Sequence, residues 1–178
     1  MDKEDSVIEN YFTALPFLVR LPLPSDLGVV AKETARLLSL GKFRLFARCR
    51  SVKHLVESCL GAYSLSAEVK FHFFDKRKAY MSDKGFLSFS QKFLCLKESE
   101  RITKIVFHEI GHIVLSEQAF YGELLKREDG ALENLASAIS IEIIRQILAI
   151  MPNESLGKIV ADEQEKLTVA IKKEKGEV

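Results

Sequence analysis

The segment Ile102–Leu115 constrains the fold more than any other part of this sequence, because it is apolar on nearly every face of a helix. Ser99 can cap this helix, and Glu100 suits the positive end of its dipole. A helix with apolar side chains all round must be covered by other elements on every side. We therefore predict a central helix, buried by a sheet on one side and by further helices on the other.

Three polar residues, His108, Glu109 and His112, interrupt the second half of this apolar segment. His108 and His112 are four positions apart, one helical turn, so both imidazoles leave the same face and can bind one metal ion. Glu109 lies at the rim of that face, where it can receive a proton from a metal-bound water rather than bind the metal. The alternative is a pair of hydrogen-bonded core histidines beside an exposed Glu.

Chance is a poor explanation of this spacing. A chain with 4 His and 18 Glu among 178 residues is expected to contain the pattern His-Glu-x-x-His about 0.01 times. Unpaired polar groups inside an apolar helix are also costly. Imidazole and carboxylate ligands suit zinc, so we predict one Zn2+ per chain, with His108 and His112 as two of its ligands.

A catalytic zinc usually takes three protein ligands, which directs attention to the carboxylates downstream. These are Glu117, Glu123, Glu128, Asp129, Glu133 and Glu142. We predict that Glu133 is the third ligand, because it lies in the first turn of a helix expected over residues 131–150. The small residues Ala136 and Ser137 follow it and let that helix approach the metal closely. Glu142, in the middle of the same helix, is the second candidate.

Hydrophobic periodicity predicts the elements around this region. One helix is expected between Ser25 and Gly41 and another over residues 51–60, and residues 116–128 are expected to be a connection. Between residues 69 and 96, alternating apolar residues and turn signals predict three or four short strands joined by tight turns, the last of them at Phe93–Leu96. The predicted fold class is α+β: a small antiparallel sheet packed on a central metal-binding helix, with further helices before and after.

The length of 178 residues and the hydrophobic content of 47% fit a single globular domain with a short appendage. We expect the domain to cover residues 1–152, with an N-terminal helical part (1–64) and a part that carries the metal site (65–152). Residues 153–178 are expected to form a charged C-terminal helix that ends in a frayed tail, Lys172–Glu177.

The charge and the cysteine content bear on the binding partners and the cellular compartment of the protein. The 26 basic and 25 acidic residues give a net charge of +1, so we expect no direct binding to nucleic acid. No stretch of about 18 uninterrupted apolar residues predicts a membrane span, and the acidic start Met1–Asp5 is unlike a secretory signal. The widely spaced Cys49, Cys59 and Cys95 fit reduced thiols better than disulfides. These features together predict a cytoplasmic protein.

The motif and its surroundings resemble a known family, the ImmA/IrrE-type small gluzincin metallopeptidases. The likeness covers about residues 65–152. It rests on a predicted sheet followed by Phe-His-Glu-Ile-Gly-His at 107–112, then Glu133, Ala136, Ile139 and a closing Met151-Pro152.

This resemblance implies a zincin-like fold in which His108, His112 and Glu133 bind zinc and Glu109 is the general base. Tyr121 would donate a hydrogen bond to the zinc-bound oxyanion, as Tyr does in related peptidases. The implied activity is that of a regulatory zinc endopeptidase that acts on a protein or peptide substrate, cleaving or inactivating a repressor of the helix-turn-helix type. An edge strand of the sheet would hold that substrate in extended form.

A second hypothesis comes from a different class of function. In it, the chain is a zinc-containing regulatory module that binds a repressor or antitoxin and has little or no peptidase turnover. Both hypotheses share the metal site and differ in whether Glu109 performs proton transfer.

Overall fold

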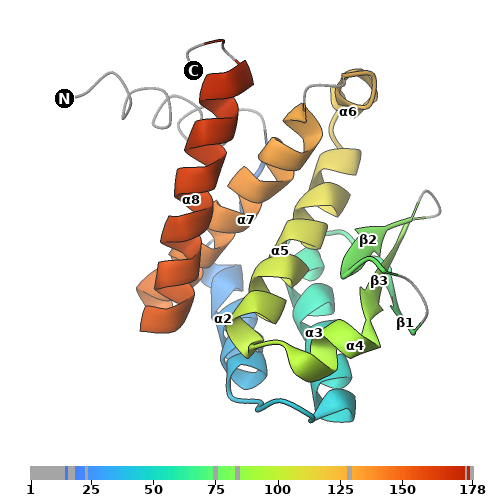
Figure 1. Cartoon of the computed structure of the whole chain (residues 1–178), viewed down its shortest axis with the longest axis vertical. Coiled ribbons are helices and arrows are strands. Elements are labelled where there is room, and N and C mark those ends of the chain that lie inside the picture. Colours follow the sequence, from blue (N-terminus) through green and yellow to red (C-terminus); the bar gives the residue numbers. More distant parts are fainter. Residues whose placement is uncertain are drawn as a thin grey trace.

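A computed structural model describes Leu15 and residues 19–22, 24–73, 76–82, 85–127, 130–174 and 176 of the chain. The fold is mixed α+β and mostly helical, with one small sheet (Figure 1). Its elements in chain order are α2 (Pro24–Leu38), α3 (Leu45–Ala62), β1 (Glu68–His72), β2 (Ala79–Met81), β3 (Phe86–Ser90), α4 (Gln91–Leu96), α5 (Ser99–Ser116), α6 (Tyr121–Leu124), α7 (Ala131–Ile150) and α8 (Glu154–Glu174).

The sheet has three strands in the order β1-β3-β2. β2 runs antiparallel to β3, as the turn between them predicts, and Met81 lies opposite Leu87. β1 runs parallel to β3, with Glu68 opposite Phe86. The prediction of an entirely antiparallel sheet is therefore wrong. It assumed that consecutive strands are neighbours, whereas the chain leaves β1, forms β2 at the far edge and only then returns to the middle of the sheet.

The fourth predicted strand, Phe93–Leu96, is also wrong, because these residues belong to the short helix α4. Ser90 ends β3 and caps the helix: its hydroxyl oxygen accepts a hydrogen bond from the backbone N–H of Phe93 at 3.2 Å. Phe93 and Leu94 are buried on one side of this turn. A short apolar run fits a buried strand or a buried helical turn equally well, and the serine cap decides between them.

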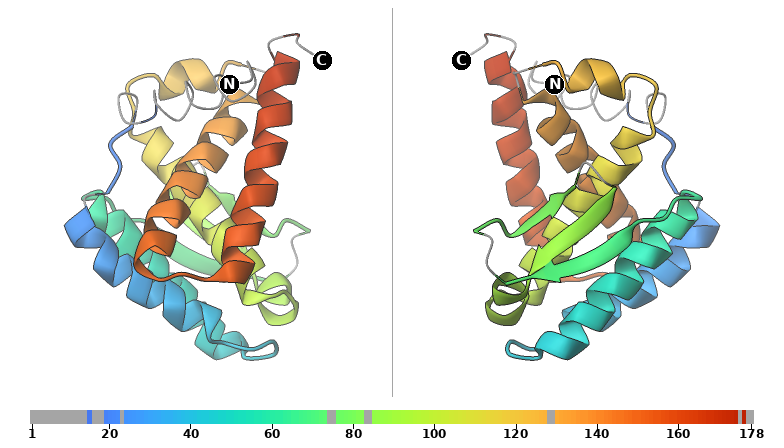
Figure 2. Two further views of the ribbon diagram at one scale, coloured as in Figure 1. Left: turned by 90° about the vertical axis from the view of Figure 1, so that its left-hand side faces the viewer. Right: turned by 90° about the vertical axis from the view of Figure 1, so that its right-hand side faces the viewer.

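Helix α5 is buried along most of its length, as predicted from its apolar faces. It contacts α2, α3, α7, α8 and β2. The views from two sides show it enclosed between the C-terminal helices and the sheet (Figure 2). Ile113 is 5% exposed, whereas Ile105 is only half-buried. The side chains at its core are Ile102, Val106, Phe107, Ile110, Val114 and Leu115.

Helix α8 packs against α7 and α5. Its buried side chains Leu156, Val160, Leu167 and Ile171 recur at helical spacing and form one stripe, which explains why this charged segment is held against the rest of the fold. The prediction of a frayed tail from Lys172 is wrong for residues 172–174, which continue the helix.

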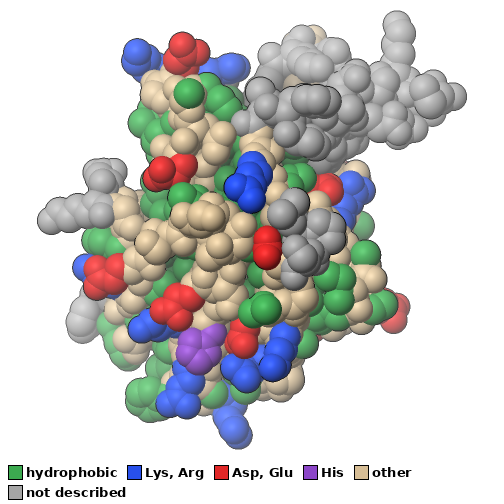
Figure 3. Space-filling view, turned by 180° about the vertical axis from the view of Figure 1, so that it is seen from behind, with side chains coloured by type: hydrophobic (Ala, Val, Ile, Leu, Met, Phe, Trp, Pro, Cys, Tyr) green, Lys and Arg blue, Asp and Glu red, His purple; other side chains and the backbone are tan. Residues whose placement is uncertain are grey.

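The charged side chains, the hydropathy of the helices and the cysteine thiols can each be compared with what the composition predicts. Seen from behind, acidic and basic side chains are interspersed over the molecule (Figure 3). None of the helices in the described parts of the chain is long and apolar enough to cross a membrane. Cys49, Cys59 and Cys95 are all free thiols, and Cys59 is buried.

The side chain of Arg48 in α3 is only 1% exposed and donates hydrogen bonds to three other chain segments. Its Nη1 donates to the carbonyl oxygens of Leu94 at 2.7 Å and Lys97 at 2.8 Å. Its Nη2 donates to the carbonyl oxygen of Leu40 at 2.8 Å and to the hydroxyl oxygen of Ser99 at 3.0 Å. One guanidinium therefore joins the segment after α2 to the end of α4 and the start of α5, which fixes where α5 begins.

Replacing Arg48 by Met should lower the free energy of unfolding by about 3–5 kcal/mol, because it leaves several buried acceptors without a donor. Arg50 lies two residues away on the same helix and is exposed, so Arg50→Met should change stability by less than about 0.5 kcal/mol. Urea unfolding followed by circular dichroism measures both. Equal unfolding midpoints for the two variants would show that the Arg48 network does not stabilise the fold.

Candidate metal centre

The two histidines of the motif leave one face of α5 and meet at their Nε2 atoms. His108 Nε2 lies 3.2 Å from His112 Nε2. Their ring centroids are 4.8 Å apart and the rings are nearly perpendicular, at 86°. Both side chains are largely shielded from solvent. The one-turn spacing thus produces the convergence that the sequence predicted.

Glu133 reaches both histidines from the first turn of α7. Its Oε2 lies 3.1 Å from His108 Nε2, and its Oε1 lies 3.3 Å from His112 Nε2. Hydrogen bonding to His108 and then to His112 lowers the pKa of the Glu133 carboxyl well below its ordinary value. The carboxyl is therefore an anion at neutral pH, as a metal ligand must be.

Close packing of α5 on α7 explains why these side chains meet. A Cβ atom added at Gly111 would lie 2.7 Å from the carbonyl oxygen of Ala136 and 3.1 Å from its Cα. Only glycine permits this approach, since real Cβ atoms do not come so near a backbone oxygen. Gly111 precedes His112 directly, and Ala136 lies three residues after Glu133. The contact therefore sets the distance across which the carboxylate reaches the histidines.

The donor set fits a zinc ion. The Nε2 atoms of His108 and His112 and a carboxylate oxygen of Glu133 lie within 4.8 Å of one another. Zinc binds nitrogen and oxygen ligands at about 2.0–2.2 Å in a tetrahedral arrangement, which places two ligand atoms about 3.3–3.5 Å apart. The two histidine nitrogens are 3.2 Å apart, and each lies close to one carboxylate oxygen of Glu133, His108 Nε2 at 3.1 Å from Oε2 and His112 Nε2 at 3.3 Å from Oε1. The three side chains could hold one ion with only small adjustments.

Ser137 contacts His108 at the ring nitrogen that faces away from Glu133. Its hydroxyl oxygen lies 3.2 Å from His108 Nδ1 and can accept the Nδ1–H hydrogen bond. That tautomer would leave the lone pair of Nε2 for a metal; in the other tautomer, Nε2–H donates to the Glu133 carboxylate and the Ser137 hydroxyl donates to Nδ1. The sequence reasoning used Ser137 only as a small side chain, although its position four residues after Glu133 puts both on one face of α7.

Glu109 is not a member of this donor group. It is 7% exposed and lines the same cleft as the three candidate ligands. Burial raises the pKa of its carboxyl above the ordinary value, and the charges of the nearby His112 and His108 partly oppose that rise. A carboxylate with a raised pKa is a better proton acceptor than an ordinary one, which suits a general base.

The cleft in front of these residues has a volume of about 310 Å³. One wall is the whole of strand β2, Ala79–Met81. Tyr121 of α6 and Leu132 of α7 complete the lining. Tyr121 therefore lies where a hydrogen bond to a bound substrate is within its reach, although its catalytic role remains a prediction. The sequence reasoning did not single out Tyr80, the other tyrosine of the cleft, because nothing in a three-residue strand marks it as part of a site.

The remaining acidic candidates and histidines lie elsewhere. Glu142 accepts a hydrogen bond from Gln146 at 3.2 Å and does not join the donor group. The exposed Glu117 and Glu123 are also outside the group, and Glu128 and Asp129 fall outside the described residues. His72 of β1 lies outside the group, and its ring nitrogens are 2.8 Å from the Ser88 hydroxyl and 3.0 Å from the Arg77 carbonyl oxygen.

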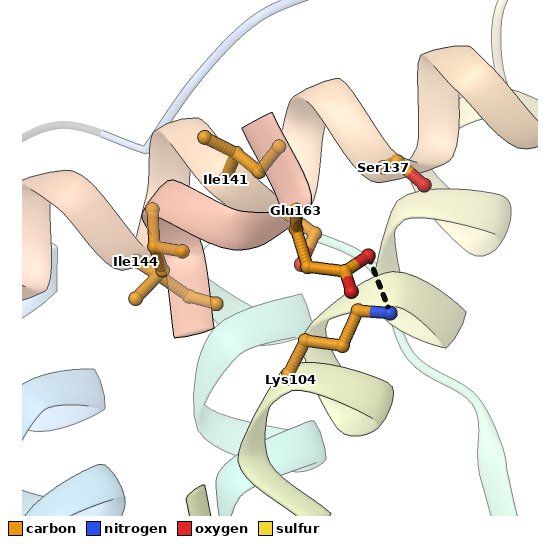
Figure 4. A pocket seen from close by; sticks show the side chains of 7 residues that line it. Lys104, Ser137, Ile141, Ile144 and Glu163 are labelled. Atoms are coloured by element: carbon orange, nitrogen blue, oxygen red, sulfur yellow. Dashed lines mark ion pairs between the residues drawn. The ribbon is translucent and has the colours of Figure 1, made fainter. Parts of the chain in front are cut away.

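An ion pair holds α8 against the back of the site. Lys104 Nζ lies 2.8 Å from Glu163 Oε2, which joins α5 to α8 one turn before His108 (Figure 4). Burial raises the pKa of the Glu163 carboxyl, but its hydrogen bonds to Lys104 and Lys166 and their charges together outweigh burial and lower the pKa below the ordinary value. Ser137 and Lys104 line the same small cavity, so the pair lies directly behind the residues that position His108.

Comparisons with protein-family models, with curated proteins and with solved structures find no match to this chain. The assignment of the site therefore rests on its geometry and on the motif.

Replacing Glu133 by Ala should weaken zinc affinity about 100-fold or more, because it removes the one carboxylate of the donor set. Glu142→Ala is the matched control on the same helix and should leave the affinity unchanged. The wild-type chain should bind close to one zinc ion. Competition with a chromophoric chelator measures all three proteins, and a stronger loss in Glu142→Ala than in Glu133→Ala would contradict the assignment.

Replacing Gly111 by Ala should lower the free energy of unfolding by about 1–3 kcal/mol, since the new methyl group clashes with the backbone of α7. It should also weaken zinc binding, because α7 carries Glu133. Gly28 lies inside α2 with nothing within 4 Å of an added Cβ, so Gly28→Ala should be stabilising by about 0.5–1 kcal/mol. Urea unfolding distinguishes the two variants. A Gly111→Ala protein as stable as the wild type would refute the close packing.

Proposed function

We propose that this protein is a zinc-dependent endopeptidase with a zincin-like fold. The observation that carries the proposal is the convergence of His108, His112 and Glu133 beside the buried carboxyl of Glu109, in a cleft walled by a strand. Each of these features has a separate use in hydrolysis of a peptide bond, and they occur together within one cleft of about 310 Å³.

The open edge of β2 provides a place for the substrate backbone. Ser90 N donates to Lys78 O at 2.8 Å and Ser82 N donates to Phe86 O at 2.9 Å, so the hydrogen-bonded pairs with β3 fall at residues 78, 80 and 82. By the alternation of an antiparallel ladder, the N–H and C=O groups of Ala79 and Met81 face away from β3. An extended peptide can therefore bind to these groups as an added strand beside the histidines.

The residues of the cleft can divide the chemistry of hydrolysis among themselves. His108, His112 and Glu133 would hold the zinc ion. When bound, zinc polarises the carbonyl of the scissile bond and lowers the pKa of the attacking water. Glu109 accepts a proton from that water and passes it to the leaving amine. Tyr121 donates a hydrogen bond to the oxygen that becomes negatively charged as the bond is attacked.

The resemblance to the ImmA/IrrE-type peptidases suggests the setting of this activity. A repressor of the helix-turn-helix type, cleaved or inactivated in the cytoplasm, is the substrate we propose. The free thiols of Cys49, Cys59 and Cys95 support a reducing compartment.

Replacing Glu109 by Gln should preserve zinc binding and lower peptide cleavage about 10²–10⁴-fold, because the amide has nearly the same shape but cannot accept the proton. The assay incubates the zinc-loaded protein with a library of synthetic peptides and counts new termini by mass spectrometry. Glu117→Gln, at the exposed end of α5, is the control and should cleave at the wild-type rate.

Two results would overturn the peptidase proposal. Full cleavage by Glu109→Gln would show that Glu109 is not the base. Zinc binding without cleavage by the wild type, together with an undiminished regulatory response from Glu109→Gln in cells, would favour the regulatory module that binds its partner without turnover.

A further inference from the structure

A second and larger cavity lies beside the first half of α5. Its volume is about 490 Å³, and α4, α5, α8 and the residue before β2 contribute to its walls. Its apolar lining residues are Phe93, which is buried, and Ile105 and Ile159. Five cationic side chains line it: Lys78, Lys97, Arg101, Lys104 and Lys166.

The charges of this basic cavity are only partly neutralised from within. Its two carboxylates are Asp162 and Glu163, and Glu163 is shared between Lys104, at 2.8 Å, and Lys166, at 2.9 Å. Within the described part of the chain, the other three cations, Lys78, Lys97 and Arg101, form no ion pair. All three are exposed, so they are available to an anionic group that enters from solvent.

The basic cavity and the metal cleft lie next to one another along α5. Arg101, Lys104 and His108 are spaced by three and four residues, so they follow one face of α5 from the cavity to the metal site. Lys78 precedes Ala79, the first residue of the strand that walls the cleft. Figure 1 shows this stretch of α5 running between α8 and the edge strand β2. A peptide that lies along β2 therefore leaves the cleft, at one of its ends, towards the basic cavity.

The distances fit a short extended segment. Arg101 and His108 are about 10 Å apart along the helix axis, from a rise of 1.5 Å per residue. An extended peptide covers that distance with about three residues. Side chains two to four positions from the scissile bond would thus reach the cations.

The chemistry of the walls favours an acidic peptide over nucleic acid. Asp162 and Glu163 would repel the continuous phosphate chain of a nucleic acid, whereas separate carboxylates can pair with Lys97 and Arg101 and avoid them. The apolar lining residues Phe93, Ile105 and Ile159 suit side chains between the acidic ones. The open edge of β2 offers main-chain groups that a peptide can match and a nucleotide cannot.

We propose that the basic cavity binds an acidic segment of the peptide held in the metal cleft, so that the protein prefers substrates with Asp or Glu two to four residues from the cleaved bond. This inference rests on the proposed function, because it assigns the selectivity of the same cleft.

Fluorescence anisotropy with labelled ten-residue peptides tests the preference. Zinc-loaded Glu109→Gln protein is used so that the peptides stay intact. The peptides share six neutral residues and carry four Glu, four Gln or four Lys at the C-terminal end, and a second set carries them at the N-terminal end. A ten-nucleotide oligodeoxythymidylate is the nucleic-acid probe.

In one of the two orders, the Glu peptide should bind about tenfold more tightly than its Gln counterpart at low salt, a difference of about 1.4 kcal/mol that two or three exposed ion pairs can supply. Introducing Lys97→Glu and Arg101→Glu into the Glu109→Gln protein should remove this preference for the Glu peptide. Lys92→Glu makes the same charge change at an exposed position of α4 outside the cavity and should preserve it. Rising salt should weaken the preference.

Equal binding of the Glu and Gln peptides in both orders would overturn the proposal. So would a loss of the Glu preference in the Lys92→Glu variant as large as the loss in the Lys97→Glu, Arg101→Glu variant. Tighter binding of the oligonucleotide, lost on substitution of Lys97 and Arg101, would also overturn it. The cleavage assay separates this inference from the proposed function. A Glu preference in binding without cleavage by the wild type would support the basic cavity as a binding site and count against the peptidase. Cleavage that does not depend on the acidic segment would support the peptidase and overturn the role of the basic cavity.

Discussion

At Gly111, α5 and α7 approach so closely that an added Cβ would lie 2.7 Å from the carbonyl oxygen of Ala136. The candidate metal site depends on this contact, because it fixes two helices that carry different ligands. His108 and His112 come from α5, and Glu133 comes from α7 about one turn before Ala136. A wider separation of the helices would leave the histidines without the carboxylate and would change the width of the cleft in front of them.

Ionisable side chains are buried near this contact, and burying them costs free energy. A role in binding a metal ion would explain why they are there. Glu109 and His112 are largely buried and His108 is partly buried, whereas the Glu133 side chain is 65% exposed. Such groups reduce stability unless they are paired or bind a cation. Glu133 already pairs with both histidines, and a zinc ion held by the three residues would cross-link α5 and α7. The same burial that disfavours the Glu109 carboxylate makes it a stronger base.

Much of this arrangement could be predicted from local patterns. The helical spacing of apolar residues identified α5 and α7, and the four-residue spacing of the histidines together with the small residues after Glu133 selected the three side chains that converge. The strand order could not be predicted in this way, because the parallel pairing of β1 with β3 depends on where the chain returns rather than on any alternation. α4 was missed because a serine cap, not periodicity, decides its conformation. The basic cavity joins Lys78, Lys97 and Arg101 from three segments, and no local pattern connects them.

The most direct test of the central claim is a crystal structure of the zinc-loaded protein with anomalous diffraction data collected on both sides of the zinc absorption edge. We predict one anomalous peak per chain, bound by the Nε2 atoms of His108 and His112 and by the carboxylate of Glu133, with Glu109 outside the coordination sphere. A protein that takes up no zinc at this position, or a peak that is bound by other residues, would contradict the account.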